Sequence, residues 1–170
     1  MDVAIISDSH VPSREPAIPD WALERVRGAD HVIHAGDFDS SAALADVRAA
    51  ASRLTAVAGN MDPRALGLPD VERVTLGGIE FVVTHGTGSR HNYEQRVAGI
   101  VTENASEGPT VGVAGHTHEL LDTTVDGVRL LNPGSVTGAS PASEATMLTA
   151  TVSDGDLSIT LHRESEIAQG

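Results

Sequence analysis

The hydrophobic positions of the chain follow one pattern in its first half and another in its second. In the first half, short apolar runs at residues 3–6, 31–35 and 54–58 alternate with segments of helical period at 21–27 and 41–51. Apolar runs of this length predict buried strands, and a helix between successive strands predicts parallel pairing through crossover connections. The first half is therefore predicted to be a βαβαβ unit.

The second half is predicted to consist mainly of β-hairpins. Apolar segments flank the dipeptides Gly77-Gly78, Asp126-Gly127 and Asp154-Gly155, which are typical of tight hairpin turns. Together the two halves predict one α/β domain over residues 1–165, followed by a loose tail at 166–170. The predicted elements of this half are strands at 71–76, 79–84, 110–114, 120–125, 128–131, 145–153 and 157–162, and a helix at 92–104.

The composition is that of a globular protein of ordinary size. The chain has 170 residues, 40% of them hydrophobic, and its apolar runs are too short to cross a membrane. No basic residue precedes the first apolar run, so a signal peptide is not expected and the protein is predicted to be cytoplasmic. Because there is no cysteine, a metal site would have to use His, Asp, Glu or Asn side chains and water.

The charge of the chain limits its partners. The formal net charge is −13, and every basic residue is an arginine. An acidic surface repels nucleic acid, whose binding depends on Lys and Arg to neutralise phosphates, so a nucleic-acid partner is not expected. Such surfaces are tolerated where salt screens the repulsion, which suggests a halophilic type of acidic surface and concerns habitat rather than activity.

Five apolar runs are each followed at once by side chains that can bind a metal ion. Ligands of open α/β sheets bind beyond the carboxyl ends of the strands, so these side chains are expected to converge. Residues two apart on an extended backbone point the same way, so each His or Asp pair can share a centre. Seven side chains are too many for one ion and suit two, if one Asp bridges. The segments are Asp8-Ser9-His10, Gly36-Asp37, Gly59-Asn60, His85-Gly86 and Gly115-His116-Thr117-His118.

This ordered set of motifs, with the trailing Asn132-Pro133-Gly134-Ser135, resembles that of calcineurin-like metallophosphoesterases. Within that superfamily it is most similar to compact bacterial and archaeal phosphodiesterases, which are relatives of the retromer scaffold subunit Vps29. The resemblance implies a four-layer α/β/β/α sandwich, in which two mixed sheets pack face to face and helices flank them. It also implies two divalent ions, one held by Asp8, His10 and His118 and the other by Asn60, His85 and His116, with Asp37 bridging them.

The resemblance further implies hydrolysis of a small-molecule phosphate ester. Two divalent ions about 4 Å apart can share a water, lower its pKa and present a bridging hydroxide to phosphorus. Asp37, Asn60 and His85 are then the predicted catalytic residues, acting through the metal-bound water. Ligation by nitrogen and oxygen suits Mn²⁺, Fe²⁺, Zn²⁺ or Ni²⁺, and Mn²⁺ is the first choice.

Two positions depart from the superfamily pattern. Many members carry a His in place of Met61, where it helps to protonate the leaving group, and several carry a further His in place of Thr87. Methionine has no proton to give, and losing a general acid costs about 10²–10⁴-fold with a poor leaving group. The departures favour phosphodiesters, or esters of aryl alcohols, over alkyl phosphomonoesters.

An alternative from another class is a protein-interaction scaffold of the Vps29 type, metal-bound or metal-free. A scaffold is free to lose metal ligands, whereas all seven positions here carry side chains that can bind metal. Nuclease activity is a second rival, against which the acidic charge argues. Pairing into a homo-oligomer is left open.

Substrate contacts are predicted at Asn60, Arg90 and His91. His91 could reach substrate from a loop, although the start of a helix is the favoured interpretation, and Arg90 could donate to phosphate as a bidentate group or remain solvated. The turn at residues 132–135 is expected to position the site rather than to contact substrate.

Several polar residues receive structural interpretations. Asp62 is predicted to cap a helix that has Pro63 at its first position. His34 lies within an apolar run and is expected to be a hydrogen-bonded core or outer-shell residue rather than a ligand. His31 and His162 are expected at the surface.

Overall fold

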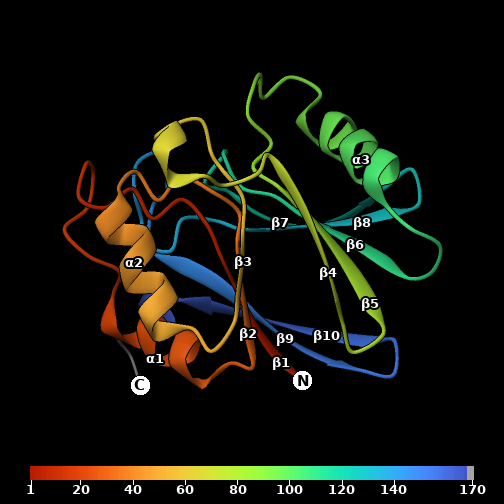
Figure 1. Cartoon of the computed structure of the whole chain (residues 1–170), viewed down its shortest axis with the longest axis horizontal. Coiled ribbons are helices and arrows are strands. Elements are labelled where there is room, and N and C mark those ends of the chain that lie inside the picture. The colour runs from red at the N-terminus through yellow and green to blue at the C-terminus, as the bar shows by residue number, and fades with distance from the viewer. Residues whose placement is uncertain (168–170) are drawn as a thin grey trace.

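The structure is a computed structural model that describes residues 1–167, and in that range it contains ten strands, four α-helices and one 3₁₀-helix (Figure 1). In chain order they are β1 (Asp2–Ile6), α1 (Asp20–Gly28), β2 (His31–His34), α2 (Ser41–Ala50), β3 (Leu54–Ala56), η1 (Arg64–Leu66), β4 (Val71–Leu76), β5 (Ile79–Thr84), α3 (Tyr93–Asn104), β6 (Thr110–Val113), β7 (Leu120–Val125), β8 (Val128–Pro133), β9 (Thr146–Ser153), β10 (Asp156–Arg163) and α4 (Glu164–Ile167).

The strands form two five-stranded mixed sheets. The first has the order β10-β9-β1-β2-β3, in which β1, β2 and β3 are parallel and the β9–β10 hairpin is antiparallel. The second has the order β4-β5-β6-β8-β7, in which β5, β6 and β8 are parallel and the two edge strands are antiparallel to their neighbours. The predicted βαβαβ opening and the three predicted hairpins are confirmed.

The two sheets pack face to face, and helices cover their outer faces (Figure 1). Alternate strand residues point to opposite faces of a sheet, so one strand serves two layers of core. Ile5 and Phe81 lie in the apolar cluster between the sheets, whereas Val32 packs in a second cluster with Val26 of α1. A third cluster joins the second sheet to α3 through Val97. The predicted four-layer α/β/β/α sandwich is confirmed.

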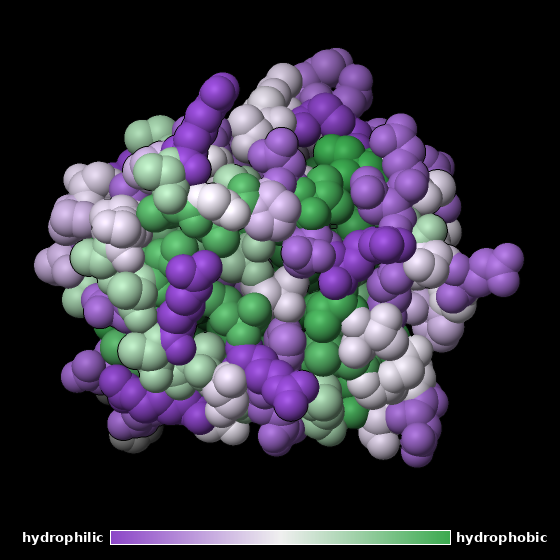
Figure 2. Space-filling model, in the orientation of Figure 1, coloured by the Kyte–Doolittle hydropathy of each residue, from purple (hydrophilic) through white to green (hydrophobic). Residues whose placement is uncertain are grey.

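Few large apolar side chains reach the surface. Among the described residues only Met1 and Met61 are large hydrophobic residues classed as exposed. Figure 2 shows that the apolar atoms visible on one face are interrupted by polar side chains. None of the helices between residues 1 and 167 combines the length and apolar character needed to span a bilayer.

Three local predictions differ from the structure. The third strand ends at Ala56, because the N–H of Ala58 donates to Pro69 O at 2.8 Å and the chain turns away from the sheet. The helix predicted from Pro63 is only the 3₁₀ turn Arg64–Leu66. His31 is not at the surface, since it is buried and its Nε2 lies 2.7 Å from Thr55 Oγ1.

The end of the chain is only partly described. Residues 164–167 form the short helix α4, which includes the first two residues of the predicted tail at 166–170. Residues 168–170 lie outside the described residues. The loose tail and the assignment of residues 1–165 to one domain stay predictions.

Two glycines test the packing between α3 and the second sheet. A Cβ at Gly112 of β6 would lie 2.6 Å from Val101 Cγ2 and 2.8 Å from Leu130 Cδ2. We expect Gly112→Ala to lower the free energy of unfolding by about 1–3 kcal/mol, because overpacking displaces neighbouring side chains. Urea unfolding measures the change.

The matched control is Gly99→Ala within α3. Nothing lies within 4 Å of a Cβ at Gly99, so alanine should raise the free energy of unfolding by about 0.5–1 kcal/mol through its better helix propensity. A stabilising effect of Gly112→Ala would contradict the packing described here.

Candidate metal centre

The candidate site lies where strand ends of the two sheets meet. The loops that follow β1, β2 and β3 of the first sheet face those that follow β5 and β6 of the second. The N–H of Asp8 donates to Gly36 O at 2.9 Å, and the N–H of Gly115 donates to His85 O at 3.0 Å, so neighbouring loops are tied by backbone bonds. The structure brings together all seven predicted metal-binding side chains, which are Asp8, His10, Asp37, Asn60, His85, His116 and His118.

The seven side chains form two adjoining groups. Ligand atoms of Asp8, His10 and His118 lie within 4.8 Å of one another, and those of Asp8 with Asp37 and His85 form a second such group; all five residues are buried. Two further side chains, Asn60 and His116, lie beside the second group and are less buried than its other members. Asn60 Oδ1 lies 3.1 Å from His85 Nε2 and 3.2 Å from His116 Nδ1.

Hydrogen bonds fix which nitrogen of each buried imidazole faces the centre. His10 Nδ1 lies 2.9 Å from Asp39 Oδ2, and His118 Nδ1 lies 2.8 Å from Ala139 O. Both oxygens can only accept, so both Nδ1 atoms donate, and a neutral ring then has a lone pair at Nε2. The two Nε2 atoms nevertheless face each other at 3.1 Å. Such a contact is favourable only when a proton or a metal cation is bound by the lone pairs.

His85 shows the same arrangement in the second group. Its Nδ1 donates to Ala35 O at 2.7 Å, which leaves Nε2 as the inward-facing atom. Nε2 lies 3.1 Å from Asp37 Oδ2 and 3.1 Å from Asn60 Oδ1, and both of these atoms are acceptors. The second group is therefore also a convergence of acceptors that a cation would satisfy.

One carboxylate oxygen provides the sharpest test of fit. Asp8 Oδ2 accepts from Ser7 Oγ at 2.7 Å, whereas the buried Oδ1 has no hydrogen-bond partner. Oδ1 lies 3.3 Å from His118 Nε2, 3.7 Å from His10 Nε2 and 3.8 Å from His85 Nε2. A buried charged oxygen without a donor is strongly unfavourable. The donor set consists of imidazole nitrogens and carboxylate oxygens, which fits divalent transition-metal ions.

The charges of the centre shift the pKa values of its members. Burial opposes ionisation of Asp8, but the neighbouring imidazoles of His10, His118 and His85 outweigh it and hold its pKa below the usual value. Burial likewise opposes protonation of His85, but the Asp37 carboxylate, helped by Asp8, raises the pKa of His85 to about 9. In the ion-free protein a proton on His85 thus balances part of the carboxylate charge, and a metal ion would have to displace that proton.

Asp62 joins two of the loops. Its Oδ2 accepts the N–H groups of Asp37 and Gly59, each at 2.8 Å, and its Oδ1 accepts the N–H of Asp39 at 2.9 Å. The prediction that Asp62 caps the following helix is wrong, because η1 has Pro63 at its N-cap and no side-chain cap bond. The carboxylate is used instead by the loops that carry Asp37 and Asn60.

The turn at residues 132–135 positions the site, as predicted. The side-chain amide of Asn132 donates to Gly115 O and to Thr117 Oγ1, each at 3.1 Å, beneath the loop that carries two of the histidines. Ser135 Oγ donates to Asp8 O at 2.8 Å. One turn therefore holds loops from both sheets.

His34 is a buried core residue, as predicted, and lies outside the metal-binding groups. Its Nδ1 accepts the N–H of Gly36 at 3.0 Å, so Nε2 donates to Ser9 Oγ at 2.7 Å. Its ring stacks on Phe38 with centroids 3.6 Å apart, and burial lowers its pKa to about 3. His34 is thus a neutral link between the loops after β1 and β2.

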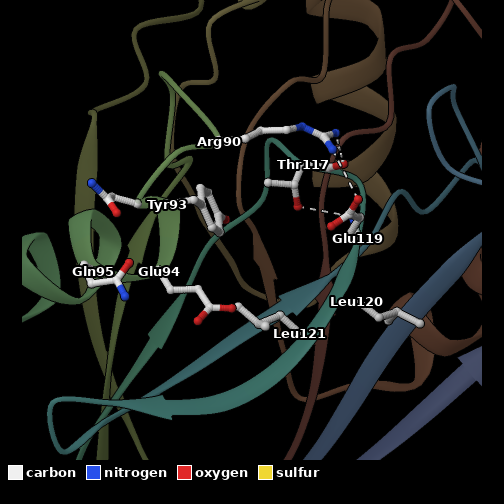
Figure 3. A pocket seen from close by; sticks show the side chains of 9 residues that line it. Arg90, Tyr93, Glu94, Gln95, Thr117, Glu119, Leu120 and Leu121 are labelled. Atoms are coloured by element: carbon white, nitrogen blue, oxygen red, sulfur yellow. Dashed lines mark hydrogen bonds and ion pairs between the residues drawn. The ribbon is translucent and has the colours of Figure 1, made fainter.

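Of the other predicted substrate contacts, Arg90 is engaged elsewhere. Its Nη2 donates to Thr117 O at 2.7 Å and its Nη1 lies 3.2 Å from Glu119 Oε1 (Figure 3). These groups line a pocket of about 250 Å³ with Tyr93 of α3. His91 is exposed and precedes α3, which begins two residues later. Their contact with substrate stays a prediction.

Asp39 was missed by sequence analysis. It is the acceptor for His10 Nδ1, and such a carboxylate fixes the orientation of a metal-binding histidine. Its position two residues after Asp37 could have indicated this role, because it places a second acidic side chain in the same loop of the site.

The chain is similar to known proteins in sequence and fold. A model described as the calcineurin-like phosphoesterase superfamily domain matches residues 1–155. A probable metallophosphoesterase of Methanothermobacter thermautotrophicus is 32% identical over 140 residues, which are 81% of this chain and 78% of the relative. A phosphodiesterase of Methanocaldococcus jannaschii is 28% identical over 153 residues, covering 81% of this chain and 86% of that protein. A crystal structure of a Vps29 variant from Entamoeba histolytica superposes with a TM-score of 0.76 and 26% identity, covering 96% of this chain and 99% of that one.

The role of Asp62 can be tested by its removal. We expect Asp62→Ala to lower the free energy of unfolding by about 2–4 kcal/mol, because three backbone N–H groups lose a charged acceptor. Denaturant unfolding of the ion-free protein measures the loss. Asp122→Ala is the matched control, since Asp122 pairs with Arg129 at the surface and should cost no more than about 1 kcal/mol. Equal losses in the two variants would show that Asp62 does not join the loops.

Proposed function

This chain belongs to the calcineurin-like phosphoesterase superfamily, a family of metal-dependent hydrolases, and from that premise we propose that it is a phosphodiesterase with two divalent metal ions. The observation that carries the proposal is the unpartnered Asp8 Oδ1 among three histidine Nε2 atoms. The proposed division of ligands is Asp8, His10 and His118 for one ion, Asn60, His85 and His116 for the other, and Asp37 as the bridge.

When bound, two such ions supply Lewis acidity, which lowers the pKa of water and offsets the charge of phosphoryl oxygens. The residues of the chain provide the geometry. Nδ1–H groups of His10, His85 and His118 donate to fixed oxygens, so the metal-binding nitrogens are oriented before any ion arrives. Asp37, Asn60 and His85 are the proposed catalytic residues, and the side-chain amide of Asn60 is a suitable donor to a phosphoryl oxygen.

The proposed preference for diesters rests on Met61. Its N–H donates to Asp37 Oδ1 at 2.8 Å, so its backbone is fixed beside the proposed bridge, while the residue as a whole is 46% exposed. A thioether cannot protonate a leaving alkoxide. The substrates best suited to such a site are small diesters and esters of acidic alcohols, and the relative from Methanocaldococcus jannaschii is named a phosphodiesterase.

The donor set also bears on the metal and on the rival function. Nitrogen and oxygen donors without sulfur suit Mn²⁺ first, and Ni²⁺, Fe²⁺ or Zn²⁺ as alternatives. The likeness to Vps29 favours an interaction scaffold as the second candidate. Retention of all seven metal-competent side chains with their orienting hydrogen bonds supports the enzyme over the scaffold.

Chelation tests the metal dependence. We expect protein stripped with chelator not to hydrolyse bis(p-nitrophenyl) phosphate, and Mn²⁺ to restore turnover. Asp37→Asn should lower the restored rate by more than about 100-fold, since outer-shell changes alone cost about 10–100-fold. Asp126→Asn, in the β7–β8 turn, is the matched control. Turnover that survives chelation would contradict the proposal, and a protein that binds no divalent ion would favour the scaffold.

Met61→His tests the diester preference. We expect this change to raise turnover of glycerol phosphate, an alkyl monoester, by about 10–100-fold, because a positioned general acid contributes about 10²–10⁴-fold. Turnover of bis(p-nitrophenyl) phosphate should change little, since nitrophenolate leaves without a proton. Met61→Leu is the control and should leave the ratio of the two rates unchanged. A wild-type protein that already hydrolyses alkyl monoesters as fast as diesters would refute the preference.

A further inference from the structure

His116 is held differently from the other proposed histidine ligands. His10, His85 and His118 are at most 7% exposed, whereas His116 is only partly buried. Its Nε2 lies 2.9 Å from Gly88 O, which can only accept, so Nε2 donates and Nδ1 keeps the lone pair that faces Asn60 Oδ1. The orientation and the tautomer of His116 therefore depend on where one backbone carbonyl lies.

That carbonyl belongs to a loop with little packing of its own. Gly88 has a φ of +128°, and the residues from 87 to 91 are exposed. The guanidinium group of Arg96 holds this loop through hydrogen bonds. Arg96 donates to Thr87 O at 2.8 Å, Ser89 O at 2.9 Å and Gly86 O at 3.0 Å, which are carbonyls on both sides of Gly88.

Arg96 is itself fixed by the helix that carries it. It lies in the first turn of α3, with its guanidinium 5.8 Å from the centroid of the Tyr93 ring. Tyr93 is buried and its hydroxyl donates to Gly115 O at 2.5 Å, at the base of the loop that carries His116. The planar fork of arginine suits such a role, because it offers several donors in one rigid geometry.

We propose that Arg96 is a positioning residue for the ion bound by Asn60, His85 and His116, acting through the Gly88 carbonyl. The inference rests on the proposed function in taking His116 as a ligand. Its effect is confined to one ion, because His10 and His118 have orienting acceptors of their own.

Coulomb attraction makes the opposite prediction from positioning. Replacing Arg96 by methionine removes a positive charge near a cation site, which by charge alone would strengthen metal binding. Loss of the positioned carbonyl would weaken it, since outer-shell partners of metal-binding histidines are worth about 10–100-fold in affinity. Weaker binding of this ion by Arg96→Met would therefore indicate an effect of positioning and not of charge.

The first measurement needs neither metal nor substrate. Long-range ¹H–¹⁵N NMR of the imidazoles in ion-free protein, at a pH where His116 is neutral, should show a single Nε2–H tautomer for wild type. Arg96→Met should show a mixture of tautomers at His116 and unchanged signals at His34. A His116 tautomer identical to that of wild type in the folded variant would overturn the proposal.

The second measurement is calorimetric titration with Mn²⁺, in which the event that His116→Ala abolishes marks the ion in question. We expect Arg96→Met to raise the Kd of that event about 10-fold and to leave the other event unchanged. Arg96→Lys, which keeps the charge and the stem, should give partial rescue. It also serves as the test variant if Arg96→Met does not fold.

Arg73→Met is the matched control, because Arg73 donates to Asn104 O at the other end of α3. It should change neither Mn²⁺ event. If the folded Arg96 variants bind each of the two ions with the same affinity as wild type, the proposal is overturned. If wild type binds no Mn²⁺ while the tautomer of His116 still depends on Arg96, the metal centre fails and the positioning of His116 stands.

Discussion

The structure depends on a cluster of hydrogen-bond acceptors that face one another. The Nε2 atoms of His10 and His118 meet at 3.1 Å, and Nε2 of His85 lies at the same distance from two acceptor oxygens. Neutral imidazoles would make such contacts unfavourable, so in the ion-free protein they depend on a bound proton as well as on the backbone that fixes the side chains. A divalent cation bound among these atoms would take the place of the proton and make the same contacts favourable.

Backbone strain shows how firmly the loops are held. Five of the proposed ligands have positive φ values, and in a non-glycine residue this conformation costs about 1–2 kcal/mol. Each strained residue lies in a loop that follows a strand of the buried core. The energy of packing two sheets against each other thus offsets the conformational energy of the positive φ values that orient the proposed ligands. The residues are Asp8, His10, Asp37, His116 and His118, with φ of 54°, 48°, 64°, 76° and 62°.

Sequence reasoning succeeded where the signal is local or repeated. Hairpins follow from glycine turns and alternating apolar positions, and the convergence of the candidate metal ligands follows from polar side chains placed after buried strands. It failed where a side chain has a distant partner. Asp62 precedes a proline and has the local signature of a helix cap, yet it accepts N–H groups some 25 positions away. Likewise Arg96 has the sequence appearance of a surface residue of an amphipathic helix, and only the fold shows its three carbonyl partners.

Three arginines near the site are hydrogen-bonded to loop carbonyls. Arg14 donates to Ser140 O, Arg90 to Thr117 O and Arg96 to the loop carbonyls, so these guanidinium groups stabilise loops. With a formal charge of −13, the chain has a field that opposes the approach of phosphate esters. Under the proposed function, attraction for the phosphoryl group would come from cations at the centre, which act at short range where screening is weak. Under the proposed function, the ions bind before the substrate, and the arginines contribute by holding the ligands of those ions in place.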